Sequence, residues 1–401
     1  MTVLWVNNNI PGEIMQNFNY CTPTRLIFGE GVIKDLPEVM SHYGKKILLT
    51  YGGGSIKKIG LYDKVLELLK GYEIYELANI MPNPKYDPSV LDGVRMCKQH
   101  NIDVILSVGG GSVLDCSKAI AGGAKYDGEP WDLITYKAET KDALPIVDII
   151  TLAATGSEYD AGGVISRTET NDKTCYSDPH LYPEVSFLDP TYTFTVSKKQ
   201  TSAGIADAMN HIFEQYFCED STILNDGFME AGLKSLMING RKCLDNPEDY
   251  NARAEMMLVC TYGCNDIYSL GNSQSGWPCH GMEHALSAYY DITHGEGLAI
   301  ITPRWMKHIL SEKTVDRFVK YGINVFGIDS NLDKMEIANK AIEKTYKFYE
   351  SINIPMHLKD VGIDESRIET MAKHVADNEG LENAWAPLLQ EDIAAIFRAS
   401  L

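Results

Sequence analysis

The sequence predicts an α/β N-terminal domain with a parallel sheet, followed by an all-α C-terminal domain. Two observations indicate this fold class. In the first half, short apolar runs of strand length alternate with helical segments, a pattern typical of a parallel sheet with helices on both faces. From about Thr191 onwards, strand-like runs become scarce and long amphipathic segments dominate. We therefore expect a boundary near Asp189-Pro190, between a domain of residues 15–190 and a domain of residues 191–401.

The strands of the first domain are expected where apolar and β-branched residues run together before a glycine or a polar break. These runs are Lys46–Tyr51, Glu73–Leu77, Asp103–Val108 and Pro145–Thr151. Helices are expected around Tyr62–Leu69, from Pro88 to Asn101, and through Asp115, Lys118 and Ala121.

The second domain is expected to be helical because its apolar residues recur at helical spacing over long stretches. The segments concerned are Ser202–Phe217, Asn225–Met237, Asn251–Ser269, Pro278–Tyr289, Val315–Tyr321 and Leu332–Ser351. His294 follows the fourth of them and is expected in a turn that Gly295 ends.

Composition narrows the class of protein. The formal net charge of −19 argues against binding to nucleic acid or to an anionic membrane surface. No run of about 20 apolar residues predicts a membrane span. The nine cysteines form no CxxC pair and are odd in number, which fits a reducing cytoplasm. Met1–Ile14 are Asn-rich and lack a basic start, so we interpret them as a leader or tag-like extension.

Two glycine-rich loops are candidates for binding a dinucleotide. Each follows an expected strand and precedes a helix, where bare backbone N–H groups and a helix N-terminus can approach a phosphate. Neither loop has the G-x-G-x-x-G spacing, so the usual fingerprint is absent. The candidate residues are Gly52, Gly53, Gly54 and Ser55 in the first loop, and Gly109, Gly110, Gly111 and Ser112 in the second.

The first glycine loop bears on the choice of cofactor. Enzymes that prefer NAD usually place an acidic residue near such a strand end, to hold the ribose 2′-OH. No Asp or Glu occurs in residues 50–61, whereas Lys57 and Lys58 are close by. This favours NADP(H) over NAD(H). The alternative is that the two lysines form a solvated helix face.

Five metal-type side chains occur in two short clusters. Asp207 and His211 are four residues apart on an expected helix, as are His280 and His284, and His294 follows. Residues four apart project from the same side of a helix. One carboxylate and three imidazoles suit Fe(II) or Zn(II) with a coordination position open for substrate. Any one of these histidines alone would more often be structural.

The motifs together resemble the iron-containing (group III) alcohol dehydrogenases, and most of all their NADPH-dependent butanol dehydrogenase and aldehyde reductase branch. The resemblance runs from about Phe18 to the C-terminus. It rests on Thr24–Gly31, Pro82–Pro84, Gly109–Ser112 with Asp115 and Lys118, Thr151–Glu158, and the Asp207/His211 and His280/His284/His294 spacings.

This resemblance implies a Rossmann-like sheet in the first domain and an active site in the interdomain cleft. It implies that Asp207, His211, His280 and His294 bind the metal, and that His284 lies beside it as the catalytic residue. It also implies that Asp115, Thr151 and Thr155 line the cofactor groove.

The expected reaction is reversible hydride transfer between NADP(H) and small to medium primary alcohols or aldehydes such as butanol and butanal. The expected partner is therefore a small-molecule substrate, and we expect a homodimer. Two alternatives stay open. One is a polyol dehydrogenase of the glycerol type, and the other is a non-catalytic protein that binds metal and nucleotide.

Overall fold

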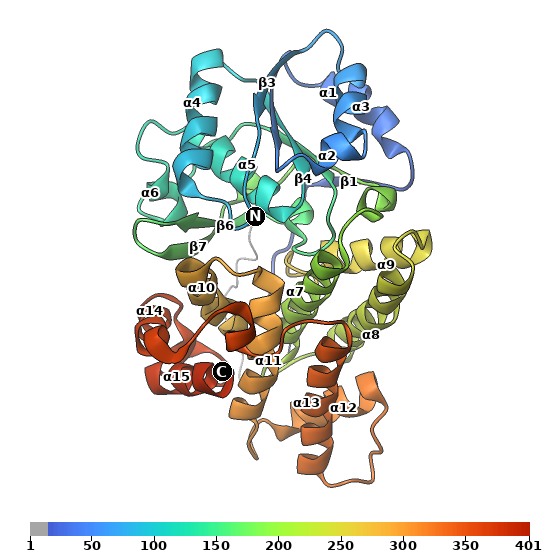
Figure 1. Cartoon of the computed structure of the whole chain (residues 1–401), viewed down its shortest axis with the longest axis vertical. Coiled ribbons are helices and arrows are strands. Elements are labelled where there is room, and N and C mark those ends of the chain that lie inside the picture. Colours follow the sequence, from blue (N-terminus) through green and yellow to red (C-terminus); the bar gives the residue numbers. More distant parts are fainter. Residues whose placement is uncertain (1–14) are drawn as a thin grey trace. The chain divides into compact units, whose positions relative to one another are not determined.

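The computed structural model describes residues 15–401, so the interpretation of Met1–Ile14 lies outside the described residues. The chain forms two compact units (Figure 1). The first unit contains Asn19–Val196 and Asn246–Asn265, and the second contains Ser197–Asp245 and Asp266–Leu401.

A six-stranded parallel sheet forms the centre of the first unit. Its order is β1-β8-β5-β4-β2-β3. The strands are β1 (Arg25–Phe28), β2 (Lys46–Tyr51), β3 (Glu73–Leu77), β4 (Val104–Gly109), β5 (Ile146–Ile150) and β8 (Val185–Leu188). The parallel α/β prediction is confirmed. The two strands that the sequence did not reveal, β1 and β8, are each only four residues long.

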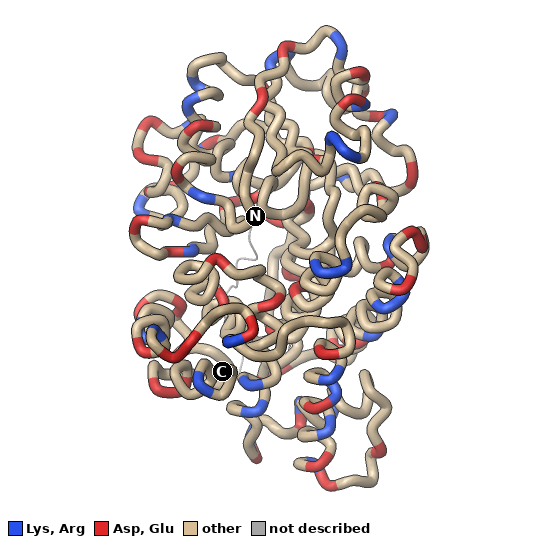
Figure 2. Tube along the Cα trace, in the orientation of Figure 1, with Lys and Arg blue, Asp and Glu red and all other residues tan. Residues whose placement is uncertain are grey.

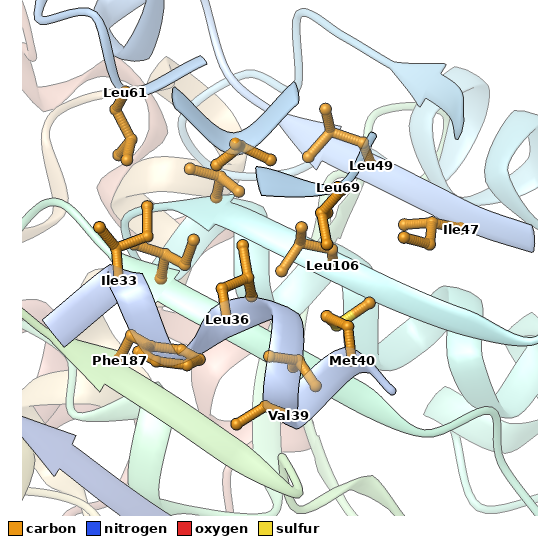
Figure 3. Close-up of a cluster of buried hydrophobic side chains, with 14 of the residues drawn as sticks. Ile33, Leu36, Val39, Met40, Ile47, Leu49, Leu61, Leu69, Leu106 and Phe187 are labelled. Carbon is orange, nitrogen blue, oxygen red and sulfur yellow. The ribbon is translucent and has the colours of Figure 1, made fainter. Parts of the chain in front are cut away.

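Helices cover both faces of this sheet (Figure 1). They are α1 (Leu36–Met40), α2 (Ser55–Lys58), α3 (Leu61–Leu68), α4 (Leu91–His100) and α5 (Gly111–Ala124). The short helix α6 (Trp131–Ile134) lies against α5 and β7 instead. Figure 3 shows the apolar side chains of α1 packed against those of the strands, with Leu36 and Met40 beside Leu106 and Phe187. Every residue of β4 is buried, as expected for a strand covered on both faces.

Two further elements complete the first unit. A two-stranded antiparallel hairpin, β6 (Gly162–Arg167) and β7 (Asp172–Ser177), was not predicted. The helix α9 (Tyr250–Thr261) also belongs to this unit, although it lies within the segment that the sequence assigns to the second domain. The Thr261 hydroxyl donates to the Glu158 carboxylate at 2.7 Å. At Gly156, with φ of 74°, an added Cβ would lie 2.6 Å from the Cys260 carbonyl oxygen, so only glycine fits.

The described residues of the second unit form helices and connecting loops, with no strand among them. Its helices are α7 (Lys198–Tyr216), α8 (Ile223–Asp245), α10 (Pro278–Tyr290), α11 (His294–Ile309), α12 (Val315–Phe326), α13 (Lys334–Ser351), α14 (Ile368–Asn378) and α15 (Gln390–Ala399). The all-α prediction is confirmed. None of the helices in residues 15–401 is both long and apolar enough to span a bilayer.

The turn expected at His294 is wrong, because this residue begins α11 and Thr293 stands at the cap position. The predicted helix Asn251–Ser269 also ends early, at Thr261. Helix α7 is buried from Thr201 to Tyr216 and forms the centre of the second unit. Helix α11 approaches α7 so closely that a Cβ on Gly295 would lie 2.0 Å from the Ala203 carbonyl oxygen.

We predict that Gly295→Ala destabilises the metal-free protein by about 1–3 kcal/mol, because the added methyl would force α11 away from the α7 backbone. The control is Gly227→Ala on α8, where an added Cβ would meet no atom within 4 Å. That change should stabilise by about 0.4–1 kcal/mol, since alanine restricts the unfolded chain. Urea unfolding followed by circular dichroism measures both. Equal effects of the two substitutions would contradict the close packing at Gly295.

Candidate metal centre and nucleotide loops

Three helices of the second unit bring four predicted residues to one point. The Asp207 Oδ1 atom on α7 lies 3.4 Å from the His211 Nε2, 3.7 Å from the His280 Nε2 and 3.7 Å from the His294 Nε2. The ligand atoms of Asp207, His280 and His294 lie within 4.8 Å of one another. His211 joins them from the same helix as Asp207, and its ring stacks on that of His280.

The donor atoms fit a divalent cation. Asp207 Oδ1 and His280 Nε2 are buried and have no hydrogen-bond partner among the described residues, an arrangement that is costly unless a ligand compensates it. One carboxylate oxygen and three imidazole nitrogens are ligands that Fe(II) and Zn(II) both accept. Asp207, His211, His280 and His294 could therefore hold one metal ion.

The electrostatics of the cluster also favour a cation. Burial alone would raise the pKa of Asp207, but the imidazoles of His211, His280 and His294 outweigh it and lower this pKa below its usual value. Burial lowers the pKa of His211, although the Asp207 carboxylate opposes the shift. Burial acts in the same direction on His280, but the Glu214 and Asp207 carboxylates overcome it and raise the pKa of His280 to about 10. The two carboxylates thus give the surroundings of His280 a negative potential, which favours a bound cation.

Two buried glutamates, which the sequence analysis missed, contact the cluster. The Glu214 carboxylate forms a hydrogen bond with the His280 Nδ1, and the Glu283 carboxylate forms one with the His294 Nδ1. Both glutamates are buried, with exposed fractions of 1% and 0%. Glu214 comes one turn after His211, and Glu283 lies between His280 and His284. A glutamate on the same helix as a predicted ligand was the only signal available in the sequence.

His284 lies beside these residues without joining the Asp207 contacts. Neither of its ring nitrogens has a hydrogen-bond partner among residues 15–401, and its Nδ1 is 3.5 Å from the Glu379 Oε1. Trp277 precedes α10 and is 38% exposed, so it is not a core residue. Its ring meets those of His211 and His280 edge to face.

In the first unit, the loops that follow β4 and β5 contact each other. These are Gly109–Ser112 and Thr151–Glu158. The Thr151 N–H donates to the Gly109 carbonyl at 2.9 Å. A Cβ on Gly111 would lie only 2.4 Å from the Thr155 Oγ1. The structure therefore brings the second glycine loop together with the two threonines that the sequence analysis grouped with it.

The first glycine loop follows β2, the neighbour of β4 in the sheet. Gly52 lies near the start of α5, since an added Cβ would be 3.7 Å from the Val113 Cγ2. Around Gly53 and Gly54 no atom lies within 4 Å of an added Cβ, and Ser55 is exposed. The backbone of this loop is therefore open to a ligand.

Asp115, the remaining predicted cofactor residue, is buried and bonded to the protein. Its carboxylate accepts from the Ser157 hydroxyl at 2.7 Å and from the Val164 N–H at 3.0 Å. Burial raises the pKa of Asp115 to about 6, although Lys118 opposes the shift. The buried Lys118 ammonium donates to the Ser157 carbonyl at 2.7 Å and to the Asp160 carboxylate at 2.7 Å. Lys118 thus ties α5 to the residues after the β5 loop.

The surroundings of Lys57 include an acidic residue that the sequence analysis did not foresee. The Lys57 ammonium lies 5.0 Å from the ring centroid of Tyr51 and 4.4 Å from that of Tyr62. Both tyrosine hydroxyls donate to Glu76 of β3, at 2.6 and 2.8 Å. The carboxylate comes from the next strand, so a search of residues 50–61 could not find it. Both of its oxygens are engaged by the tyrosines.

Two family models match the chain. The model of the iron-containing alcohol dehydrogenases matches residues 23–190, and that of the C-terminal part of the Fe-containing alcohol dehydrogenase family matches residues 201–401. Together they span nearly all of the chain.

Similar proteins and structures agree with these models. The chain is 45% identical over 390 residues to NADH-dependent butanol dehydrogenase A of Clostridium acetobutylicum, covering 96% of this chain and all of the relative. It is 38% identical over 368 residues to the NADPH-dependent aldehyde reductase YqhD of Escherichia coli, covering 91% of this chain and 94% of that protein.

A crystal structure of NADH-dependent butanol dehydrogenase A from Thermotoga maritima matches with a TM-score of 0.91 at 36% identity, over 96% of this chain and 99% of that one. The structure of Escherichia coli YqhD matches with a TM-score of 0.92 at 35% identity, with the same coverage. With one relative above 40% identity along its whole length and both family models matched, the chain belongs to the iron-containing alcohol dehydrogenase family.

Proposed function

We propose that this protein reduces small to medium aldehydes reversibly to primary alcohols, using NADP(H) and one divalent metal ion. The observation that carries the proposal is the convergence of three imidazole Nε2 atoms on the buried Asp207 Oδ1. Relatives named butanol dehydrogenase and aldehyde reductase support the class of substrate.

Asp207, His211, His280 and His294 are the proposed ligands of Fe(II) or Zn(II). In this class of reaction the nicotinamide supplies a hydride to the carbonyl carbon while the metal acts as a Lewis acid toward the carbonyl oxygen. The contribution of these four residues is to hold the ion in a buried place, where its charge is weakly screened by water.

The cofactor's phosphates are proposed to lie against the Gly52–Ser55 and Gly109–Ser112 loops. The α5 N-terminus, which starts at Gly111, presents unpaired N–H groups that favour an anion. We propose that Lys57 and the backbone N–H groups of the first glycine loop bind the 2′-phosphate of NADP(H). Relatives are named both NADH- and NADPH-dependent, so their names do not decide the preference.

The substrate is proposed to be uncharged. The basic side chains found within 4.0 Å of the Asp207 carboxylate are the imidazoles of His211, His280 and His294. Figure 2 shows basic and acidic residues interspersed along the trace. A phosphorylated or carboxylated substrate would require a basic cluster at the metal. Trp277, edge to face with two of the imidazoles, is proposed to contact the substrate's alkyl chain.

His284 is proposed to transfer the proton that converts the alkoxide to the alcohol. It is buried, and its ring nitrogens are not occupied by other hydrogen bonds of the described residues. The Glu379 Oε1 lies 3.5 Å from the His284 Nδ1, and the Glu379 side chain is 25% exposed. In the direction of aldehyde reduction, this carboxylate would pass a proton from solvent to His284.

We also propose that the protein works in the cytoplasm, because its nine cysteines are odd in number and contain no CxxC pair, which is typical of a protein kept in a reducing compartment. A homodimer is proposed on the general ground that cyclic dimers are the commonest oligomers.

Metal-free protein reloaded separately with Fe(II) and Zn(II) should oxidise NADPH when butanal is added, and should oxidise NADH more slowly. The loss of absorbance of the reduced cofactor follows the reaction directly. Protein without metal is the control. If neither metal supports oxidation of either cofactor with butanal, the proposal fails. Turnover with glycerol but not with butanol in the reverse direction would favour the polyol alternative.

The variant His284→Ala should keep its bound metal and lose roughly 10²-fold or more in turnover, because general acid catalysis contributes factors of this size. Its pH–rate profile should also differ in shape from that of the wild type. Metal analysis and steady-state kinetics across the pH range measure both effects. His42→Ala, at an exposed position in the first unit, is the control. An unchanged pH–rate profile would contradict the proton-transfer role.

The variant Lys57→Ala should raise the KM for NADPH roughly tenfold and leave that for NADH nearly unchanged, because it removes one charged donor to the 2′-phosphate. Lys70→Ala, an exposed lysine after α3, serves as the control. The comparison of the two KM values in each variant is the measurement. Equal increases in the KM for NADPH and for NADH would mean that Lys57 does not bind the 2′-phosphate.

A further inference from the structure

The two buried glutamates of the metal cluster are held in different ways. The Glu214 Oε1 accepts from two backbone N–H groups at the start of α10, at 2.5 Å from Cys279 and 3.2 Å from His280. Its Oε2 is bonded to the His280 Nδ1. The Glu283 Oε1 instead accepts from the Ser287 hydroxyl, while its Oε2 is bonded to the His294 Nδ1.

We infer that Glu214 and Glu283 are positioning residues that fix the tautomers of His280 and His294. An ionised carboxylate only accepts hydrogen bonds, so each Nδ1 must carry a hydrogen. The Nε2 of each ring is then left with its lone pair, and both Nε2 atoms face Asp207. Metal-binding imidazoles commonly depend on such a partner on the other nitrogen. The inference rests on the proposed metal site.

His211 differs from the other two imidazoles. Its Nδ1 is buried and has no hydrogen-bond partner among the described residues. Its partner in the cluster is Asp207, on the same helix and 3.4 Å from the Nε2. The tautomer control is therefore confined to the two rings that come from α10 and α11.

The partners of the two glutamates predict unequal effects of glutamine. At position 214 the amide oxygen must stay on the two backbone N–H groups, because these can only donate. The amide NH2 group then faces the His280 Nδ1, which must accept, and the ring carries its hydrogen on Nε2. That tautomer cannot bind a metal through Nε2.

At position 283 glutamine can keep the working arrangement. The amide oxygen accepts from the His294 Nδ1, and the NH2 group turns to the Ser287 hydroxyl. A hydroxyl can accept as well as donate, and the Ser287 hydroxyl has a second acceptor in the Ile292 carbonyl, 3.4 Å away. Glu283→Gln should therefore preserve the tautomer that Glu214→Gln reverses.

The experiment measures Zn(II) affinity by competition with a chromophoric chelator for the wild type and four variants. Glu214→Gln and Glu283→Ala should each bind Zn(II) roughly 10–100-fold more weakly, whereas Glu283→Gln should stay within about threefold of the wild type. The matched control is Glu230→Gln, because Glu230 is a buried glutamate of the same unit that is bonded to Tyr216 and Asn324 rather than to a histidine. It should bind Zn(II) as the wild type does.

Thermal unfolding of the metal-free proteins shows which variants fold. If Glu214→Gln does not fold, the Zn(II) affinities of Glu283→Gln and Glu283→Ala test the inference instead. Equal losses of Zn(II) affinity in these two variants would overturn it. A folded Glu214→Gln that binds Zn(II) within threefold of the wild type also overturns it. A wild type that binds no Zn(II) would instead refute the proposed metal site itself.

Discussion

The second unit is organised around one buried carboxylate. Asp207 is 3% exposed, and a charge in such a place is costly unless opposite charge or hydrogen bonds compensate it. Three imidazoles on α7, α10 and α11 surround the Asp207 Oδ1 at 3.4 to 3.7 Å, so these helices converge closely, and a bound cation would compensate the charge. Gly295 allows α11 to reach the α7 backbone, and Glu214 anchors the start of α10 through its backbone N–H groups. The residues that let the three helices pack together are therefore the same ones, or neighbours of the ones, that are proposed to bind the metal.

In the first unit, three loops follow the carboxyl ends of the neighbouring strands β2, β4 and β5. The loops after β4 and β5 pack on each other, and the buried Lys118 holds the residues after β5 in place. Parallel strands put these loops at one edge of the sheet, and helix α5 adds its N-terminus there.

Local sequence patterns predicted four of the six strands of the parallel sheet and most of the long helices, because the apolar periodicity of these segments reflects which faces are buried. The patterns failed where tertiary contacts decide. Helix α9 looks like its helical neighbours, but the Thr261–Glu158 contact ties it to the first unit. At the metal cluster, the Asp207 carboxylate and the three imidazoles could be predicted from the sequence, because their spacing is typical of metal ligands. Glu214 was not, because its bond to His280 joins residues 66 positions apart. Glu76 was missed for the same reason.

The most direct test of this account is X-ray absorption at the zinc edge of protein loaded with one equivalent of Zn(II). We predict a first shell of nitrogen and oxygen at about 2.0–2.2 Å, with the outer-shell scattering of three imidazoles. Substitution of Asp207 by Ala should remove the ion or alter that shell. A shell that contains sulfur, or fewer than two imidazoles, would contradict a metal centre built on Asp207, His211, His280 and His294.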